Sequence, residues 1–202
     1  MLTATAAVIR SRGRVAQVDL FKRWGGAPTL RFLRLQDPTI DQLTTRRYHT
    51  FLKERIDGFN PPASIEEEKR DPARADSQYI SATKWLLEFT RDEKRFPLVA
   101  KENANYGLHR NLFGLRGPGS IVSLVCIAWS IIWAWVVSDG SLEQLPAEPM
   151  IFGFCSLIFL LAWRLWITEA FVREAADAYA LALLASCEKA KSTNNNDKES
   201  AI

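Results

Sequence analysis

Polar and charged side chains gather in one short stretch of the chain and are of the types that bind anionic ligands. Arg91 is followed by Glu102, Asn103, Tyr106 and Arg110. The last four are separated by one, three and four residues, which places them along one side of a helix. Guanidinium forks pair with phosphate or carboxylate oxygens, so a buried version of this set would form a pocket for an anion such as a nucleotide. The alternative is a structural hydrogen-bond network, because ion-pair networks occupy similar places.

The chain lacks the short motifs on which most catalytic chemistry rests. No GxxxxGK[ST], HExxH, CxxC or GxSxG occurs among its 202 residues, so nucleophile–base pairs, zinc sites and phosphate loops have no support. Cys126, Cys155 and Cys187 have no metal-site spacing and are typical of small packing residues. We therefore expect no enzyme activity, with no catalytic residue, metal or cofactor. An enzyme that acts on nucleotides through the charged members of the set above is the least favoured alternative.

Two arginines beside a histidine offer a second anion-binding interpretation. Arg46 and Arg47 precede His49 in a segment with helical spacing, and guanidinium groups suit phosphate oxygens. An exposed helix face is the favoured interpretation, because surface arginines need no special role.

Two uninterrupted apolar runs lie in the second half of the chain. Residues 119–138 (GSIVSLVCIAWSIIWAWVVS) contain no ionisable side chain, and residues 150–168 (MIFGFCSLIFLLAWRLWIT) contain only Arg164. Each run has about the 20 residues that a helix needs to cross a ~30 Å hydrocarbon core. A backbone in lipid must satisfy its own hydrogen bonds, so both runs are expected to be helices. The sequence therefore predicts a two-helix transmembrane hairpin.

The charges around these runs are unevenly distributed. Residues 1–118 hold 21 basic and 14 acidic residues, a net charge of +7, whereas residues 119–202 have a net charge of −4. The loop between the runs contains Asp139, Glu143 and Glu148 but no Lys or Arg. Because Lys and Arg flank the cytoplasmic ends of membrane helices, we expect both termini in the cytoplasm and the acidic loop outside.

Residues at the inner end of the second run are typical of a membrane interface. Arg164 lies about one turn from the end of the run, where its side chain can extend to the cytoplasmic interface beside Trp163 and Trp166. The alternative for Arg164 is a gating or ion-selective role, because a charge within a span is costly unless it is solvated or paired.

Small residues on both runs favour close helix packing. They are Ser123, Ser130 and Ala134 on the first run and Gly153 and Ser156 on the second. Such faces pack either within a hairpin or between protomers. Neither run carries the strong polar stripe that a water-filled pore needs.

Residues 1–118 predict a cytoplasmic domain of three or four helices. Helix starts are expected at Asp37-Pro38, at Ser64 and at Asp71-Pro72. An apolar stripe follows from Ala75 to Thr90, and Pro97 begins a further helix that is expected to break at the glycines of residues 114–119.

The two ends of the chain have weaker patterns. Residues 1–36 predict no secure element, apart from a turn at residues 24–28. Their basic residues either contact anionic lipid headgroups or form a solvated arm. After the second run, residues 169–191 predict a helix that continues directly from it, for self-association or for packing on the domain. Residues 192–202 predict a disordered tail. The fold class is thus mainly α.

Several segments together resemble a family of bacterial two-span membrane proteins associated with antiphage defence. These segments are RWGGAPT at 23–29, RYH at 47–49, DP at 71–72, TRD at 90–92, FPL at 96–98, EN at 102–103, YG at 106–107 and RN at 110–111. The resemblance covers most of the predicted domain and the start of the first span. It implies a small inner-membrane protein that works beside nucleotide-signalling or nuclease components.

The combined pattern and resemblance lead to two functional hypotheses. The first is a defence effector that senses a cytoplasmic nucleotide or protein signal, forms homo-oligomers and perturbs the inner membrane. Oligomers are required because two helices cannot enclose a channel. The alternative is a passive anchor or scaffold for a soluble enzyme. The expected partners are the lipid bilayer, further copies of the chain, and a soluble protein or nucleotide signal, without direct nucleic-acid binding.

Overall fold

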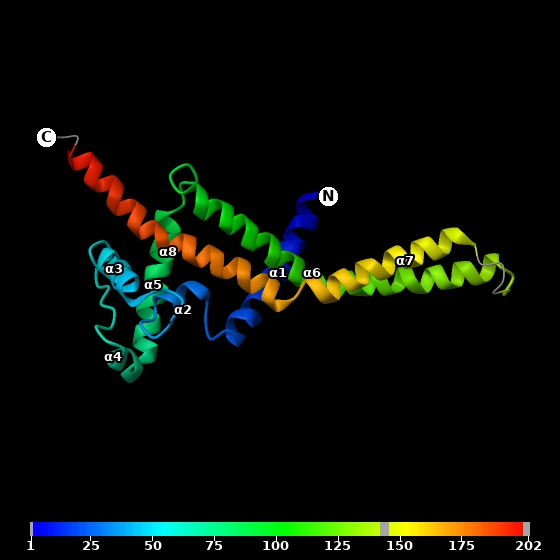
Figure 1. Ribbon diagram of the computed structural model, residues 1–202, viewed down its shortest axis with the longest axis horizontal. Coiled ribbons are helices and arrows are strands. Elements are labelled where there is room, and N and C mark those ends of the chain that lie inside the picture. Colours follow the sequence, from blue (N-terminus) through cyan, green and yellow to red (C-terminus); the bar gives the residue numbers. More distant parts are fainter. Residues whose placement is uncertain (1, 142–145, 200–202) are drawn as a thin grey trace. The chain divides into compact units, whose positions relative to one another are not determined.

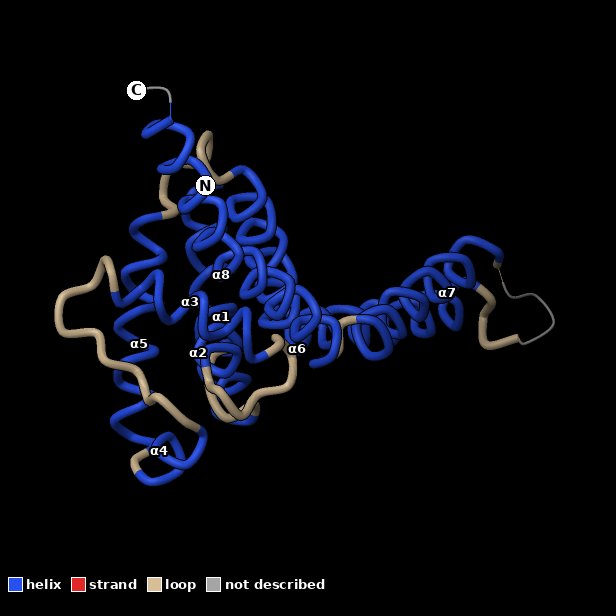
Figure 2. The backbone as a smooth tube through the Cα atoms, turned by 60° about the vertical axis from the view of Figure 1, so that its left-hand side comes forward, coloured by secondary structure: helices blue, strands red, loops and turns tan. Residues whose placement is uncertain are grey.

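A computed structural model describes residues 2–141 and 146–199, and the side chains of residues 4–141 and 146–189. Within these ranges every regular element is a helix, which confirms the mainly α fold class (Figure 1, Figure 2). The elements are α1 (Leu2–Arg23), α2 (Pro28–Leu33), α3 (Gln42–Lys53), α4 (Ile65–Arg70), α5 (Pro72–Phe89), α6 (Pro97–Val137), α7 (Ala147–Leu161), the π-helical turn η2 (Ala162–Trp166) and α8 (Glu169–Glu199).

The chain forms two compact units. The hairpin unit consists of the residues up to 18 together with residues 107–173, and the bundle unit consists of residues 19–106 together with those from 174 onward. Helices α1, α6 and α8 each contribute residues to both. This division differs from the predicted boundaries at 118/119 and 168/169, because the first helix packs on α6 and most of α8 enters the bundle core.

The predicted helix starts of α4 and α5 are confirmed by their side-chain caps. The Ser64 side chain accepts a hydrogen bond from the backbone N–H of Glu67, and the Asp71 side chain accepts one from Arg74. Such caps satisfy backbone donors that the first helical turn leaves without partners. Helix α5 ends at Phe89, so the predicted apolar stripe forms one continuous helix.

Helix α3 begins later than predicted, because Asp41 rather than Asp37 caps it. The Asp41 side chain accepts a hydrogen bond from the backbone N–H of Thr44. Asp37 instead closes a local turn, in which its Oδ1 accepts from the N–H of Thr39 at 2.9 Å. Both aspartates are good cap residues, and the chain uses the one that directly precedes the helical run.

The core of the bundle unit comes from α2, α3, α5 and α8. Fully buried apolar side chains include Leu33 on α2, Leu52 on α3, Leu86 on α5, and Leu183 and Leu184 on α8. Burial of each such side chain is worth about 1.5–3 kcal/mol. Helix α8 therefore packs on the bundle, which is one of the two roles expected for the helix after the second apolar run.

The region for which the sequence predicted no secure element, residues 1–36, contains two helices. Residues 2–23 form the regular helix α1, and residues 28–33 form α2, although the sequence predicted no secure helix there. The turn predicted at residues 24–28 is present, and Gly25 and Gly26 have φ values of 75° and 126°. Glycine reaches this region at low cost, which allows the sharp reversal after α1.

The expected break before the first apolar run is also absent. Helix α6 runs for 41 residues from Pro97 to Val137 and contains Gly114, Pro118 and Gly119. The two glycines occupy places where another helix or an indole ring approaches closely. They therefore serve packing rather than a turn.

A break lies instead between the second apolar run and α8. Helix α7 ends at Leu161, η2 follows, and Ile167 has φ −79° and ψ 71°, outside the helical region. Thr168 then accepts a hydrogen bond from the N–H of Phe171 at 3.3 Å and starts α8. The prediction of one continuous helix through this point is thus wrong.

The backbone of α8 is helical to Glu199, beyond the predicted end at 191, since no Gly or Pro interrupts it. Residues 200–202 of the predicted tail lie outside the described residues.

Candidate functional site: the apolar helix pair and its base

Three of the five predicted ligand-binding residues lie in exposed or partly exposed positions. Arg91 follows α5 and donates a hydrogen bond to Glu88 at 3.2 Å, with both side chains largely exposed. On α6, Glu102 accepts a long hydrogen bond of 3.5 Å from the Asn105 amide, and Asn103 is exposed. None of the three lines the pockets described below.

The other two predicted ligand-binding residues take part in packing between helices. Tyr106 is buried in the bundle unit and its ring stacks on Tyr179 of α8, with the centroids 6.0 Å apart. Arg110 belongs to the hairpin unit, where its Nη1 donates to Gln17 Oε1 of α1 at 2.7 Å. These contacts fit the structural-network interpretation of the polar stretch.

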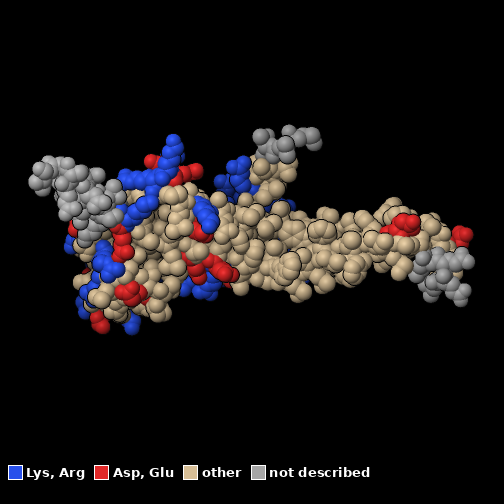
Figure 3. All heavy atoms as spheres, turned by 45° about the horizontal axis from the view of Figure 1, so that its top comes forward, with Lys and Arg blue, Asp and Glu red and all other residues tan. Residues whose placement is uncertain are grey.

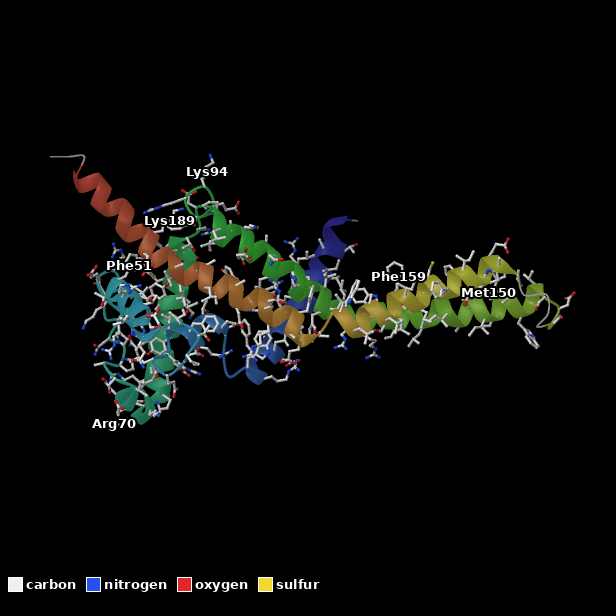
Figure 4. All side chains as sticks on the ribbon, viewed as in Figure 1. Phe51, Arg70, Lys94, Met150, Phe159 and Lys189 are labelled. Atoms are coloured by element: carbon white, nitrogen blue, oxygen red, sulfur yellow. The ribbon has the colours of Figure 1, made fainter. Side chains whose placement is uncertain are left out.

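Helix α6, and α7 together with η2, are long and apolar enough to span a membrane, and they are exposed. The most apolar 18-residue windows of Pro97–Val137 and Ala147–Trp166 are only 17% and 11% buried. A core helix of a soluble protein would be mostly buried. Large side chains such as Val125, Ile131 and Phe159 instead have 63–65% of their surface exposed. Figure 4 shows Phe159 and Met150 on α7, toward its two ends.

The far end of the helix pair is acidic. Asp139 and Glu148 lie at the ends of the connection between α6 and α7, and the surface along the two helices shows neither acidic nor basic atoms in the face seen in Figure 3. Glu143, the third acidic residue predicted for this loop, lies outside the described residues.

The small residues predicted for helix packing lie between α6 and α7. Ser123, Ser130 and Ser156 are buried, with 5–7% of their surfaces exposed. Gly153 of α7 faces Ser130 so closely that a Cβ on this glycine would overlap the Ser130 hydroxyl. The structure therefore uses these residues inside the pair.

The hydroxyl groups of these serines are satisfied within their own helices. Ser123 Oγ donates to the carbonyl of Gly119 at 3.0 Å, and Ser156 Oγ donates to Phe152 at 2.8 Å. Ser130 Oγ donates to Ile127 at 2.7 Å. Internal bonds of this kind avoid the cost of an unpaired polar group in an apolar environment. None of these three hydroxyl groups is therefore free to line a polar path.

Arg116 ties the base of the helix pair together. Its Nε donates to the carbonyl of Trp163 and its Nη2 to the carbonyl of Arg164, each at 3.1 Å. The backbone leaves the helical conformation at Ile167. The carbonyls of Trp163 and Arg164 therefore belong to the last turn of the helix, whose carbonyl groups lack the usual N–H partner four residues later. A guanidinium fork matches two adjacent acceptors.

Trp163 completes the base by packing on α6. A Cβ placed on Gly119 would overlap the Trp163 indole ring, so the absence of a side chain there admits the ring. Arg164 and Trp166 are exposed at this end, Trp166 at 76%. The three residues that the sequence predicted for a membrane interface, Trp163, Arg164 and Trp166, lie together in η2, and the sequence used Arg116 only as a flanking charge. The position of Arg116 directly before Gly117-Pro118-Gly119 was the feature of the sequence that could have indicated its role at the base.

Ala134 and Gly153 also line a shallow apolar groove on the flank of the helix pair. Its volume is about 280 Å³. The lining residues are Ser130, Ile131, Ala134, Trp135, Pro149, Met150 and Gly153.

A basic pocket of about 380 Å³ lies in the bundle unit, where α3 meets the loop of residues 60–63. Arg46, Thr50 and Lys53 occupy one face of α3 with spacings of four and three, and none of the pocket's lining residues is acidic. Arg46 therefore lines a cationic recess, whereas Arg47 pairs with Glu188 of α8 at 2.8 Å.

The buried His49 at the floor of this pocket is neutral. Its Nε2 lies 2.8 Å from the carbonyl of Leu33, which requires the ring nitrogen to donate. Burial, opposed by this hydrogen bond and assisted by the charge of Arg46, lowers the pKa of His49 to about 4. The ring stacks on Tyr79, with the centroids 5.4 Å apart. His49 is therefore a structural residue at neutral pH.

A second buried polar group organises the bundle unit and was missed by sequence reasoning. The Glu68 carboxylate is 2% exposed and accepts hydrogen bonds from the N–H groups of Leu35 and Gln36 and from the Tyr79 hydroxyl, the last at 2.8 Å. Three donors on one carboxylate satisfy a charge that burial alone would make costly. In the sequence, Glu68 was one of three consecutive glutamates and carried no distinguishing signal.

No group of three or more His, Cys, Asp or Glu side chains suited to a metal occurs among the residues that the structure describes. Comparisons with family models, with curated proteins and with solved structures find no match to this chain. The functional argument therefore rests on the helix pair and its base.

Proposed function

We propose that α6 and α7 cross the inner membrane of a bacterium as a hairpin and anchor the bundle unit at its cytoplasmic face, where a soluble protein partner docks. The observation that carries this proposal is the exposed apolar surface of the helix pair, 17% and 11% buried in its most apolar windows. An apolar surface of this extent would promote aggregation in water, and lipid covers it at no such cost.

The charges around the helix pair support the orientation. Arg116 and Arg173 lie on the side of the hairpin base, whereas Asp139 and Glu148 lie at the opposite end. Because basic residues remain on the cytoplasmic side, the base and both termini face the cytoplasm.

The seam between the helices favours an anchor over a pore. Ser123, Ser130 and Ser156 are buried and bonded to their own helices, and the outer faces are apolar. A pore would require copies to separate this seam and expose its hydroxyl groups. The geometry therefore supports the scaffold hypothesis better than the membrane-perturbing effector.

One observation favours an oligomerising defence effector as the second candidate function. The apolar groove beside Ala134 and Gly153, about 280 Å³ in volume, offers a recess in which an apolar side chain of another protomer's helix could pack. Homo-oligomers built on this groove would place further helices around the hairpin.

Two measurements separate these functions. The purified chain, reconstituted in vesicles that contain a trapped dye, should float with the lipid and leave dye retention unchanged, alone or with its cellular partner. Release of the dye on addition of a cytoplasmic extract or nucleotide would favour the effector and contradict the anchor. In cells, a soluble protein that crosslinks to the chain should float with the membrane only when the chain is expressed, and its unchanged flotation without the chain would reject the scaffold.

A further inference from the structure

The first helix crosses α6 at the base of the hairpin with its backbone in direct contact. A Cβ on Gly114 of α6 would lie 2.7 Å from the Gly13 nitrogen and 2.9 Å from the Arg12 carbonyl oxygen. A Cβ on Gly13 would in turn overlap the Asn111 side chain. The 2.7 Å hydrogen bond from Arg110 to Gln17 lies beside this crossing. Paired glycines thus fix where α1 meets α6.

The position of the crossing along α6 matches the headgroup layer of a bilayer, if the hairpin spans the membrane as proposed. Gly114 precedes Gly119, the first residue of the apolar run, by five residues, or about 7.5 Å of helix. The polar interface on each side of the hydrocarbon core is about 5–8 Å thick. Helix α1 therefore meets α6 at the depth of the lipid headgroups.

The surface of α1 that does not pack on α6 carries apolar and basic side chains together. Apolar or small residues recur there at spacings of four and three, and Val8 and Val15 are 57% and 65% exposed. This face consists of Ala4, Val8, Ser11, Val15 and Val18. The exposed Arg12 lies within this face, four residues after Val8 and three before Val15, and the exposed Arg10 and Arg14 lie farther around the helix. Residues 2–18 contain no Asp or Glu.

We propose that α1 binds the anionic phospholipids of the leaflet from which the hairpin enters. Val8 and Val15 contact the outer part of the acyl chains, and the guanidinium groups of Arg10, Arg12 and Arg14 bind lipid phosphates. Two observations favour lipid as the occupant of this face. Residues 2–18 of α1 carry basic but no acidic side chains, and α1 contacts α6 at Gly114, close to the start of the apolar run. Each arginine near an anionic surface is worth about fivefold in binding.

The test measures the depth of spin labels in the full chain, after Cys126, Cys155 and Cys187 are replaced by alanine. Single labels are placed at Val15, at Val125 within α6 as the reference for insertion, and at Lys53 as the aqueous reference. The chain is reconstituted in phosphatidylcholine nanodiscs with and without phosphatidylglycerol. Collision with oxygen and with a water-soluble nickel chelate then reports the environment of each label.

We expect the Val15 label to be protected from the nickel chelate in discs with phosphatidylglycerol and to become accessible in the Arg10→Gln, Arg12→Gln, Arg14→Gln variant. A Val15 label that is aqueous while the Val125 label is in lipid would overturn the inference about α1 alone. An aqueous Val125 label would reject the proposed function on which it rests. Protection that is equal without anionic lipid, or spin–spin broadening between copies at Val15, would assign the face to another occupant.

Discussion

The contact between Gly119 and Trp163 predicts different effects on stability for the same substitution at two glycines of α6. Gly119→Ala places a methyl group where the Trp163 indole lies. Gly107→Ala is the matched control, because a Cβ at Gly107 meets no atom within 4 Å. Gly117 also has open space, but it precedes Pro118, and a Cβ there would crowd the proline ring in a helix.

The expected change in the free energy of unfolding has two contributions, and one of them is the same in both variants. Replacing glycine by alanine within a helix gains about 1 kcal/mol at either position. At residue 119, overpacking against the indole costs about 1–3 kcal/mol, whether the ring shifts or the helices separate. The difference between the two variants should therefore be about 1–3 kcal/mol, with Gly107→Ala the more stable.

The assay is reversible unfolding of the full chain in mixed micelles with increasing sodium dodecyl sulfate, followed by tryptophan fluorescence. Trp163 lies at the contact itself, so its emission should also shift in Gly119→Ala. Equal free energies of unfolding for the two variants, with unchanged emission, would refute the packing of Trp163 on Gly119.

Further predictions concern the bundle unit. Tyr79→Phe removes one of the three donors to Glu68 and should lower the free energy of unfolding by about 1.5–3 kcal/mol, measured by urea denaturation in micelles; a loss below the error would mean that the hydroxyl is not bound there. Because the pKa of His49 is lowered from 6.5 to about 4 in the folded state, the unfolded chain binds more protons between these values. Stability should therefore fall by about 2 kcal/mol from pH 7 to pH 5, and His49→Asn should remove this dependence if the histidine causes it. Burial raises the pKa of Cys187 to about 12, so its thiol should react with iodoacetamide at pH 8 only after unfolding, and rapid labelling of the folded chain would contradict its burial.

The sequence predicted those features of the fold that depend on local chemistry. Ser64 and Asp71 are cap residues next to apolar stripes, so the starts of α4 and α5 could be read from neighbouring positions alone. The two apolar runs were equally evident, because length and composition suffice to recognise them. The small residues between the helices followed from their spacing.

The sequence could not reveal features that depend on contacts between distant segments. The glycines at 114 and 119 suggested a break, whereas α1 and Trp163 occupy the space above them. Glu68 became recognisable only when its partners at residues 35, 36 and 79 came together. Four of the predicted ligand residues were grouped by their spacing on one helix, but Tyr106 packs on α8 and Arg110 binds α1, whereas Glu102 and Asn103 lie at the surface.

The central claim, that α6 and α7 form a membrane hairpin with both ends in the cytoplasm, is tested most directly by cysteine accessibility in intact cells. Single cysteines at Ala147, at the loop end of α7, and at Lys94, in the turn before α6, are exposed positions for a membrane-impermeant maleimide. The native cysteines are first replaced by alanine. The account predicts labelling at residue 147 once the outer membrane is opened, and at residue 94 only after the inner membrane is disrupted. Labelling of both residues at the same step, or of residue 94 first, would contradict it.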